Sequence, residues 1–276
     1  MIKIMVDSAS DCTREEGIFD LYVPLTVSIG GTDYLAGENL TADQFYKLLT
    51  AGEEFPKTSQ PSPEVYEKAF AQAKADGDEV ICFALSSALS GTYQSAVIAK
   101  EMVDYEGIYI IDTKMVTYMI GVLVGYANSR IRENIPAARI VTECEDLKTR
   151  IKVLAGVDTL EYLYKGGRMS RTSAAVGSLA GIKPIITLTE DGTVGIAGKA
   201  IGIARACQTI LTKLKTWELD ERFPLYTLYT YGNENPDFFE KKLTEAGYTI
   251  AGRKQVGPAI GAHTGPGVYG VLFVTK

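Results

Sequence analysis

Predominantly apolar runs that end in polar turns recur along the first half of the chain. The clearest run is 79–85, which stops at a hydroxyl-rich turn, and runs 2–6 and 108–111 stop at Asp7 and Asp112. An unbroken apolar run is typical of a parallel strand covered on both faces, although a buried helix can share the pattern. We therefore predict a buried parallel strand in each run.

Helical spacing of apolar side chains follows these strands. Beyond Thr92 the apolar side chains recur at helical intervals, so we predict that a helix begins at 90–92. Pro63 favours a helix start because proline suits the first helical position. Helices are also predicted after the capping-box spacing at 41–44 and over 63–75, 116–132 and 136–150. Residues 21–29 are predicted to form one strand, and residues 57–63 a stiff loop because of their many helix and strand breakers.

The alternation of strands and helices begins again near residue 151. Strands are predicted over 152–157, 184–189, 194–197, 225–231, 248–255 and 268–274, and helices over 172–181, 203–216 and 237–246. Strands that alternate with helices in both halves are typical of α/β architecture. We predict two α/β domains, residues 1–150 with a parallel sheet and residues 151–276.

Two stretches carry candidate binding chemistry. Ser90, Gly91 and Thr92 stand where the helix after the central strand begins, and the free amides and dipole of a helix N-terminus can hold an anion. The same residues are equally typical of an ordinary helix cap. His263 is the one histidine of the chain and lies in residues 257–267, which contain four glycines and two prolines. We interpret this segment as a rigid loop and His263 as a polar contact rather than a core residue.

Composition narrows the classes of function. The formal net charge is −6 and the basic residues are spread along the chain, which argues against binding of nucleic acid. The four cysteines are far apart and lack zinc-site spacing, so reduced thiols and no metal site are expected. The most apolar stretch, 115–127, is too short to span a bilayer, and the first residues do not resemble a signal peptide. We therefore expect a cytoplasmic protein with no transmembrane segment.

Five motifs stand in a fixed order that covers nearly the whole chain. They are Asp7-Ser8-Ala9-Ser10-Asp11, Thr58-Ser59-Gln60-Pro61-Ser62, residues 90–96, Thr159-Leu160-Glu161-Tyr162-Leu163 with Lys165-Gly166-Gly167-Arg168, and residues 257–267. As a set they resemble the DegV family. The resemblance implies two α/β domains with a ligand cleft between them, and a long-chain fatty acid whose carboxylate lies in the cleft and whose acyl tail is buried. It further implies a lipid-binding protein that is not itself an enzyme and presents the acid to a separate fatty acid kinase subunit.

The resemblance also implies which residues bind the fatty acid: Thr58, Ser59, Ser90, Gly91, His263 and Thr264. Thr58 and Ser90 resemble the carboxylate contacts, and His263 and Thr264 resemble a further polar side of the site. The chemistry agrees with these roles, because a hydroxyl can donate to a carboxylate while a helix N-terminus adds partial positive charge. No lysine or arginine is required on this interpretation, and no cofactor or metal is expected besides the bound fatty acid.

Two departures from the family pattern concern the partners and the rim of the site. Members of the family usually carry a basic stretch after the position of Lys199. This chain has Ala200-Ile201-Gly202-Ile203-Ala204 there instead. This replacement predicts weaker docking of a kinase, since charges at the rim of an interface mainly steer association. An acidic residue expected after Leu35 is replaced by Ala36-Gly37. Transient contact with a membrane remains a further expectation for a carrier of lipid.

Two other functions compete with fatty acid binding. A serine hydrolase would use Ser90 as nucleophile and His263 as base, oriented by Asp7 or Asp112, but the chain lacks a G-x-S-x-G elbow. A structural or regulatory protein with an empty cleft is the second alternative. The chain also lacks the G-x-x-x-x-G-K-[ST] phosphate loop, so no ATP site is expected within it.

Overall fold

Strand β6 (Glu79–Ala84), the central apolar run, lies inside a four-stranded parallel sheet. In this computed structural model, which describes residues 1–52, 54–170 and 181–276, the strand order is β2-β1-β6-β7. The neighbouring strands are β1 (Ile2–Asp7), β2 (Leu21–Val23) and β7 (Ile108–Asp112). All three pairings are parallel, which confirms the prediction of buried parallel strands.

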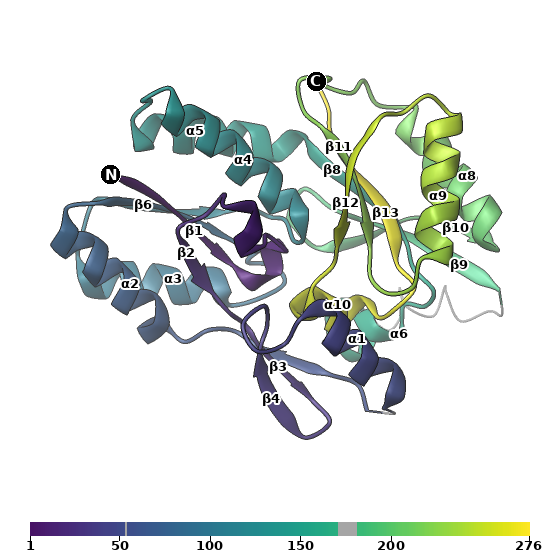
Figure 1. The fold of residues 1–276 in the computed structure, drawn as a ribbon, viewed down its shortest axis with the longest axis horizontal. Helices are drawn as coiled ribbons and strands as arrows, with labels where there is room; N and C mark the ends of the chain where they lie inside the picture. The colour runs from purple at the N-terminus through teal and green to yellow at the C-terminus, as the bar shows by residue number, and fades with distance from the viewer. Residues whose placement is uncertain (53, 171–180) are drawn as a thin grey trace.

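Helices cover both faces of this first sheet. α2 (Pro63–Asp76) and α3 (Thr92–Val103) pack on one face, where Met5 and Cys82 are buried. α4 (Tyr118–Arg132) and α5 (Ala137–Leu147) pack on the other, where Ile4 and Phe83 are buried. A short 3-10 turn, Lys148–Arg150, follows α5. The two helix pairs lie above and below the sheet in Figure 1. Both faces of the central strands β1 and β6 are therefore covered over most of their length, which explains their predominantly apolar sequences.

The second half of the chain builds a mixed six-stranded sheet in the order β10-β9-β8-β13-β11-β12. The strands are β8 (Ile151–Gly156), β9 (Ile182–Leu188), β10 (Val194–Ile201), β11 (Leu225–Tyr229), β12 (Ile250–Gln255) and β13 (Tyr269–Val274). Only the pairing of β11 with β12 is parallel among those described. The second domain is therefore α/β in composition, but its sheet is largely antiparallel.

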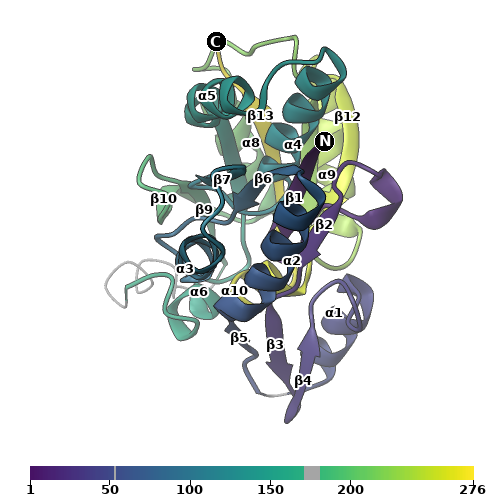
Figure 2. The ribbon, with the colours of Figure 1, turned by 90° about the vertical axis from the view of Figure 1, so that its left-hand side faces the viewer.

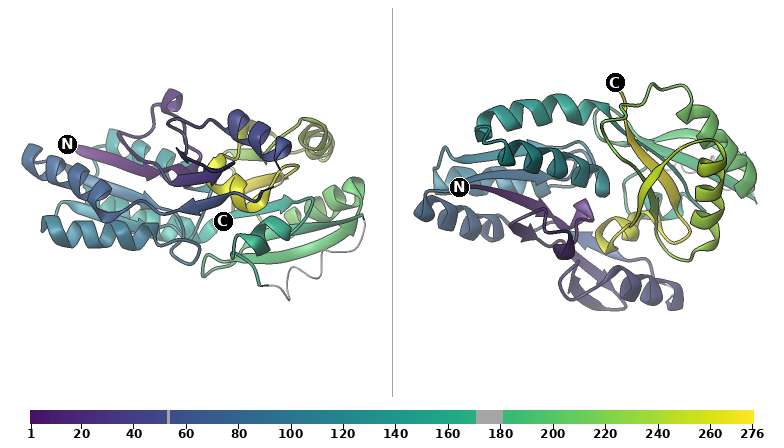
Figure 3. Two further views of the ribbon diagram at one scale, coloured as in Figure 1. Left: turned by 90° about the horizontal axis from the view of Figure 1, so that it is seen from below. Right: turned by 45° about the horizontal axis from the view of Figure 1, so that its top comes forward.

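The two faces of the second sheet have different neighbours. α8 (Ile203–Leu214) and α9 (Glu234–Glu245) cover the outer face, around Ile210 and Phe239. They form the right-hand edge of the right view in Figure 3. The inner face carries Leu228 and Leu272, which belong to the same apolar cluster as Ile4 of the first sheet. The fold class, two packed α/β domains, is as predicted. The boundary at residue 150 remains a prediction.

A third, small sheet in the order β4-β3-β5 was not expected from the sequence. It contains β3 (Thr26–Ile29), β4 (Thr32–Leu35) and β5 (Lys57–Ser59), and it lies beside helix α1 (Ala42–Ala51) below the first sheet in Figures 1 and 2. The prediction of one strand over 21–29 was wrong, because the chain leaves the first sheet at Pro24, which has no N–H to donate. The prediction of a loop over 57–63 was wrong at its start, because β3 supplies an antiparallel partner for Lys57–Ser59.

Short turns and one short helix connect the larger elements. Short 3-10 turns cover Ser8–Ser10 and Arg14–Glu16, and α6 (Glu161–Lys165) follows β8. The helix predicted over 172–181 falls on residues that, apart from Gly181, lie outside the described part of the chain. Across the described ranges, no helix combines the length and the apolar character needed to cross a membrane.

Candidate functional site

His263 lies on a helix, not in the rigid loop predicted for residues 257–267. α10 (Pro258–Thr264) begins with proline at its first turn, and it ends at Gly265, whose φ of 74° is in the left-handed region that favours glycine. His263 is only 8% exposed. The expectation of a loop histidine outside the core was therefore wrong: the glycines permit a short buried helix instead.

Contacts with the first half of the chain hold α10 in place. The Asp11 carboxylate accepts from the N–H of Gly257 at 2.9 Å, and the Tyr46 hydroxyl donates to the carbonyl of Val256 at 2.9 Å. A Cβ on Gly261 would lie 2.4 Å from the Tyr46 hydroxyl oxygen, so only glycine lets the helix approach this closely. Segments from both domains thus fix the position of His263.

Thr58 and His263 come together across the domain interface. Thr58 Oγ1 and His263 Nε2 share a hydrogen bond of 2.8 Å, whose direction depends on the histidine tautomer. Thr58 lies on β5, so the small third sheet presents this hydroxyl to α10. Two residues predicted from separate motifs therefore form one unit.

The segment after β5 also reaches the start of α3. Gln60 Nε2 donates to Ser95 Oγ at 3.0 Å. A Cβ on Gly91 would lie 2.0 Å from Gln60 Oε1, so the missing side chain of Gly91 leaves room for Gln60. Gly91 thus brings the Thr58 segment and the Ser90 turn close together.

The six predicted site residues divide into two groups. Thr58, Ser90, His263 and Thr264 line one cavity, whereas Ser59 is exposed and Gly91 lies behind Gln60, and neither lines that cavity. The Ser90 hydroxyl pairs with that of Thr92 at 2.9 Å, and Ser90 Oγ also accepts from the Thr92 N–H at 3.3 Å. The Ser90 hydroxyl therefore has protein partners, while the residue also lines the cavity.

The cavity is predominantly apolar. The space between its walls, open mouth included, amounts to about 860 Å3. Its apolar lining is Leu25, Leu85, Leu89, Val116, Val153, Ala155, Leu163, Ile186, Leu188, Val194, Leu228, Val256, Ala259, Ile260 and Val268. Its polar lining is Thr58, Ser90, Thr117, Arg168, Thr187, His263 and Thr264. Each domain contributes both apolar and polar residues to this lining.

Arg168 is a cavity residue that the sequence interpretation left out. Its Nε donates to the carbonyl of Leu89 at 2.9 Å and its Nη1 to the carbonyl of Gly166 at 2.6 Å. These bonds hold the guanidinium beside Ser90 and beside Gly166, whose backbone packs against His263. The signal was present in the sequence as Gly166-Gly167-Arg168. Because hydroxyls and a helix terminus can hold a carboxylate by themselves, the sequence alone does not require this arginine.

Burial lowers the pKa values of both His263 and Arg168. Desolvation, with a smaller contribution from the nearby Arg168 cation, lowers the pKa of His263 to about 4. Desolvation also lowers the pKa of Arg168, which nevertheless remains a cation at neutral pH. His263 Nδ1 is buried and has no hydrogen-bond partner among the described residues. The neutral tautomer with its proton on Nε2 is favoured, because it leaves a lone pair rather than an N–H unpaired.

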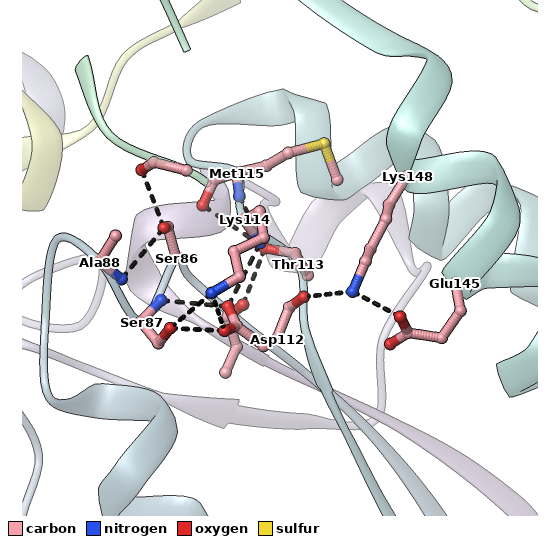
Figure 4. A network of polar contacts seen from close by, with 11 residues as sticks. Ser86, Ser87, Ala88, Asp112, Thr113, Lys114, Met115, Glu145 and Lys148 are labelled. Carbon is pink, nitrogen blue, oxygen red and sulfur yellow. Dashed lines mark hydrogen bonds and ion pairs between the residues drawn. The ribbon is translucent and has the colours of Figure 1, made fainter. Parts of the chain in front are cut away.

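The contacts do not assemble the triad of the hydrolase hypothesis. His263 pairs with Thr58, and the Asp7 carboxylate accepts from the N–H groups of Ala9 and Leu85. Asp112 pairs with Ser87 and Lys114 in the network of Figure 4. Within residues 1–52, 54–170 and 181–276, no series of hydrogen bonds joins Ser90, His263 and an acid. The same ranges contain no group of three His, Cys, Asp or Glu side chains that could hold a metal.

Comparison with known proteins gives the family. The protein-family sequence model described as "Uncharacterised protein, DegV family" matches residues 1–276. The chain belongs to the DegV family. A DegV domain-containing protein from Caldanaerobacter subterraneus subsp. tengcongensis is 37% identical over 282 residues, which cover 100% of this chain and 99% of that protein.

Solved DegV structures share the whole fold. A stearic-acid-binding protein from Eubacterium ventriosum has a TM-score of 0.90 at 30% identity, over 100% of this chain and 99% of its own. A DegV family protein from Thermus thermophilus, described for its fatty acid binding, has a TM-score of 0.88 at 29% identity, with coverage of 100% and 99%. The resemblance seen in the sequence motifs is thereby confirmed, as is the DegV-like arrangement of two α/β domains.

Proposed function

We propose that this DegV protein binds a long-chain fatty acid, with the carboxylate at the Thr58–His263 pair and the acyl tail along the apolar cavity. The observation that carries the proposal is one apolar cavity whose lining includes the hydrogen-bonded Thr58–His263 pair together with Arg168 and Ser90. An apolar cavity with a few convergent polar groups suits an amphiphile with one charged end. The fatty-acid-binding relatives support the same ligand class.

Each polar residue would contribute a different interaction to the carboxylate. With the proton of His263 on Nε2, that N–H donates to Thr58 Oγ1, and the Thr58 hydroxyl is then free to donate to the ligand. Arg168 would supply the positive charge, and a bound carboxylate would offset the desolvation of its guanidinium. The Ser90 hydroxyl could exchange its bond with Thr92 for one to the ligand.

The function would be delivery of the acid rather than its conversion. We propose that the protein acts in the cytoplasm, takes up fatty acid in transient contact with a membrane, and presents it to a separate fatty acid kinase. The exposed Ile201, at the end of β10, lies in the stretch where a basic surface was expected. Docking to a kinase should therefore rely less on charge here than in relatives with basic residues at that place.

Lipid extraction followed by titration tests the proposal. Purified protein analysed by native mass spectrometry should carry a mass equal to one long-chain fatty acid. After removal of lipid, a fluorescent fatty acid should bind with one-to-one stoichiometry, and stearate should displace it. A chromogenic ester incubated with the same protein should yield no product above background. Absence of bound lipid together with absence of displacement would refute the proposal, and ester turnover lost in Ser90→Ala would favour the hydrolase.

A further inference from the structure

Thr117 combines three features that its position in the fold does not explain. It precedes α4 as the N-cap residue, where a threonine hydroxyl commonly accepts from a free N–H of the first turn. Here the side chain makes no such capping bond. The side chain is 6% exposed, and its Oγ1 has no hydrogen-bond partner among the described residues. The same residue lines the apolar cavity.

The backbone of Thr117 is also strained. Its φ of 58° and ψ of −161° lie in a region that glycine adopts readily and a β-branched residue rarely does. The N–H of Thr117 donates to the carbonyl of Ala9 at 2.7 Å, which helps hold this conformation. Strained residues of this kind concentrate at ligand-binding positions. Glycine would adopt this backbone conformation with little strain. The presence of threonine therefore indicates that its side chain has a role.

Other hydroxyls on the cavity wall have protein partners. Thr187 donates to the carbonyl of Val153 at 2.7 Å, and Thr264 donates to the carbonyl of Ile260 at 3.2 Å. Thr58 is paired with His263. Thr117 comes from a different element, the start of α4, and none of the bonds described in residues 1–52, 54–170 and 181–276 joins it to that pair. It is therefore a second polar point in the cavity, separate from the proposed carboxylate site.

We propose that Thr117 is a specificity-determining residue that hydrogen-bonds an oxygen substituent, such as a hydroxyl group, on the acyl chain of the ligand. The inference rests on the proposed function, since it assumes an acyl chain in this cavity. The Thr117 hydroxyl is already buried and unpaired in the empty protein, and a plain hydrocarbon chain leaves it so. A chain with a hydroxyl at the matching carbon would satisfy both groups. The wild-type protein should therefore prefer the hydroxylated chain to the analogue that lacks the hydroxyl.

Matched variants separate the hydroxyl from the backbone strain. Thr117→Val keeps the shape and the β-branch but removes the hydroxyl. Thr117→Ser keeps the hydroxyl and serves as the control. Thr117→Gly removes the hydroxyl and relieves the strain at positive φ, so it provides a second hydroxyl-free variant if the valine protein folds poorly. Thermal unfolding of each variant confirms that the proteins compared are folded.

The measurement is displacement of a fluorescent fatty acid by stearate and by a panel of hydroxystearates, each with its hydroxyl at a different carbon. We expect one regioisomer to bind wild type and Thr117→Ser about tenfold more tightly than it binds Thr117→Val, equal to about 1.4 kcal/mol. Stearate should bind Thr117→Val as tightly as wild type or more so. Equal effects of the substitution on stearate and on every hydroxystearate, or no effect on any, would overturn the inference while leaving the proposed function intact. Failure of wild type to bind stearate and the whole panel would overturn both.

Discussion

The Thr58–His263 hydrogen bond allows a sharp test of the carboxylate site by Thr58→Val. Valine has nearly the shape of threonine, so β5 and its pairing with β3 should persist while the hydroxyl is lost. Thr58→Ser, which keeps the hydroxyl, is the matched control. The variant removes one donor to the proposed carboxylate and leaves both nitrogens of the buried His263 without a protein partner.

Loss of the Thr58 hydroxyl should change both the affinity for the fatty acid and the stability of the protein. A hydrogen bond to a charged group contributes about 1.5–3 kcal/mol, so the dissociation constant for a fatty acid should rise roughly tenfold to a hundredfold. Leaving a buried imidazole nitrogen unpaired costs about 1–3 kcal/mol, and this should appear as a lower free energy of unfolding of the empty protein. Because Thr58 is only half-buried, water can partly replace the lost bond, so the lower end of that range is expected.

Titrations of a fatty acid and of the corresponding fatty alcohol distinguish the two effects. The alcohol carries no charge, so its affinity should fall by only a few-fold in Thr58→Val. Urea unfolding of the lipid-free proteins measures the stability change independently. Equal losses for acid and alcohol, or no loss for either, would show that Thr58 does not hold the carboxylate, and a comparable loss in Thr58→Ser would point to damage of β5 instead.

Three further predictions concern Arg168, His263 and the exposed Ile201. Arg168→Gln should weaken binding of the acid by about tenfold or more at neutral pH and that of the alcohol far less, because the proposed charge is removed; equal losses in parallel titrations would contradict this. The pKa of His263 is about 4 in the folded state against 6.5 ordinarily, so its contribution to stability is fully present above pH 6.5 and is lost as the pH falls toward 4. The stability difference between wild type and His263→Gln in urea unfolding should therefore shift against wild type by about 2–4 kcal/mol across that window, and a constant difference would refute the assignment. Ile201→Arg should speed acyl-phosphate formation with an added fatty acid kinase, while the chain alone with ATP and magnesium should form none; an unchanged rate would remove the role of this stretch in docking.

Local signals in the sequence were sufficient for much of the first domain. The apolar run of β6 predicted its own burial, because a strand covered on both faces has no polar side to show. Pro63 and the turn before Thr92 marked the starts of α2 and α3 correctly. These features depend on neighbouring residues only, so the sequence order reveals them directly.

The motif set determined the family and, through it, four residues of the cavity wall. It did not show how they meet. Thr58 lies in a strand only because β3 offers a partner, and the glycines around His263 permit a helix only because Tyr46 and Asp11 pack against it. Pairing and helix packing of this kind depend on residues distant in sequence, which local propensity does not report.

Arg168 and Thr117 show most clearly what the sequence alone left undecided. Arg168 was visible in a motif, but its place beside His263 follows from bonds to two backbone carbonyls in different segments. Thr117 is a polar residue within the apolar stretch 115–127, and only the tertiary structure shows that it lines the cavity and that its hydroxyl is buried without a partner. The sequence determined the central strands β1, β6 and β7, the starts of α2 and α3, and the family, because these depend on local pattern and on motif order. The structure alone decided which polar atoms share the cavity, because that depends on how the two domains pack against each other.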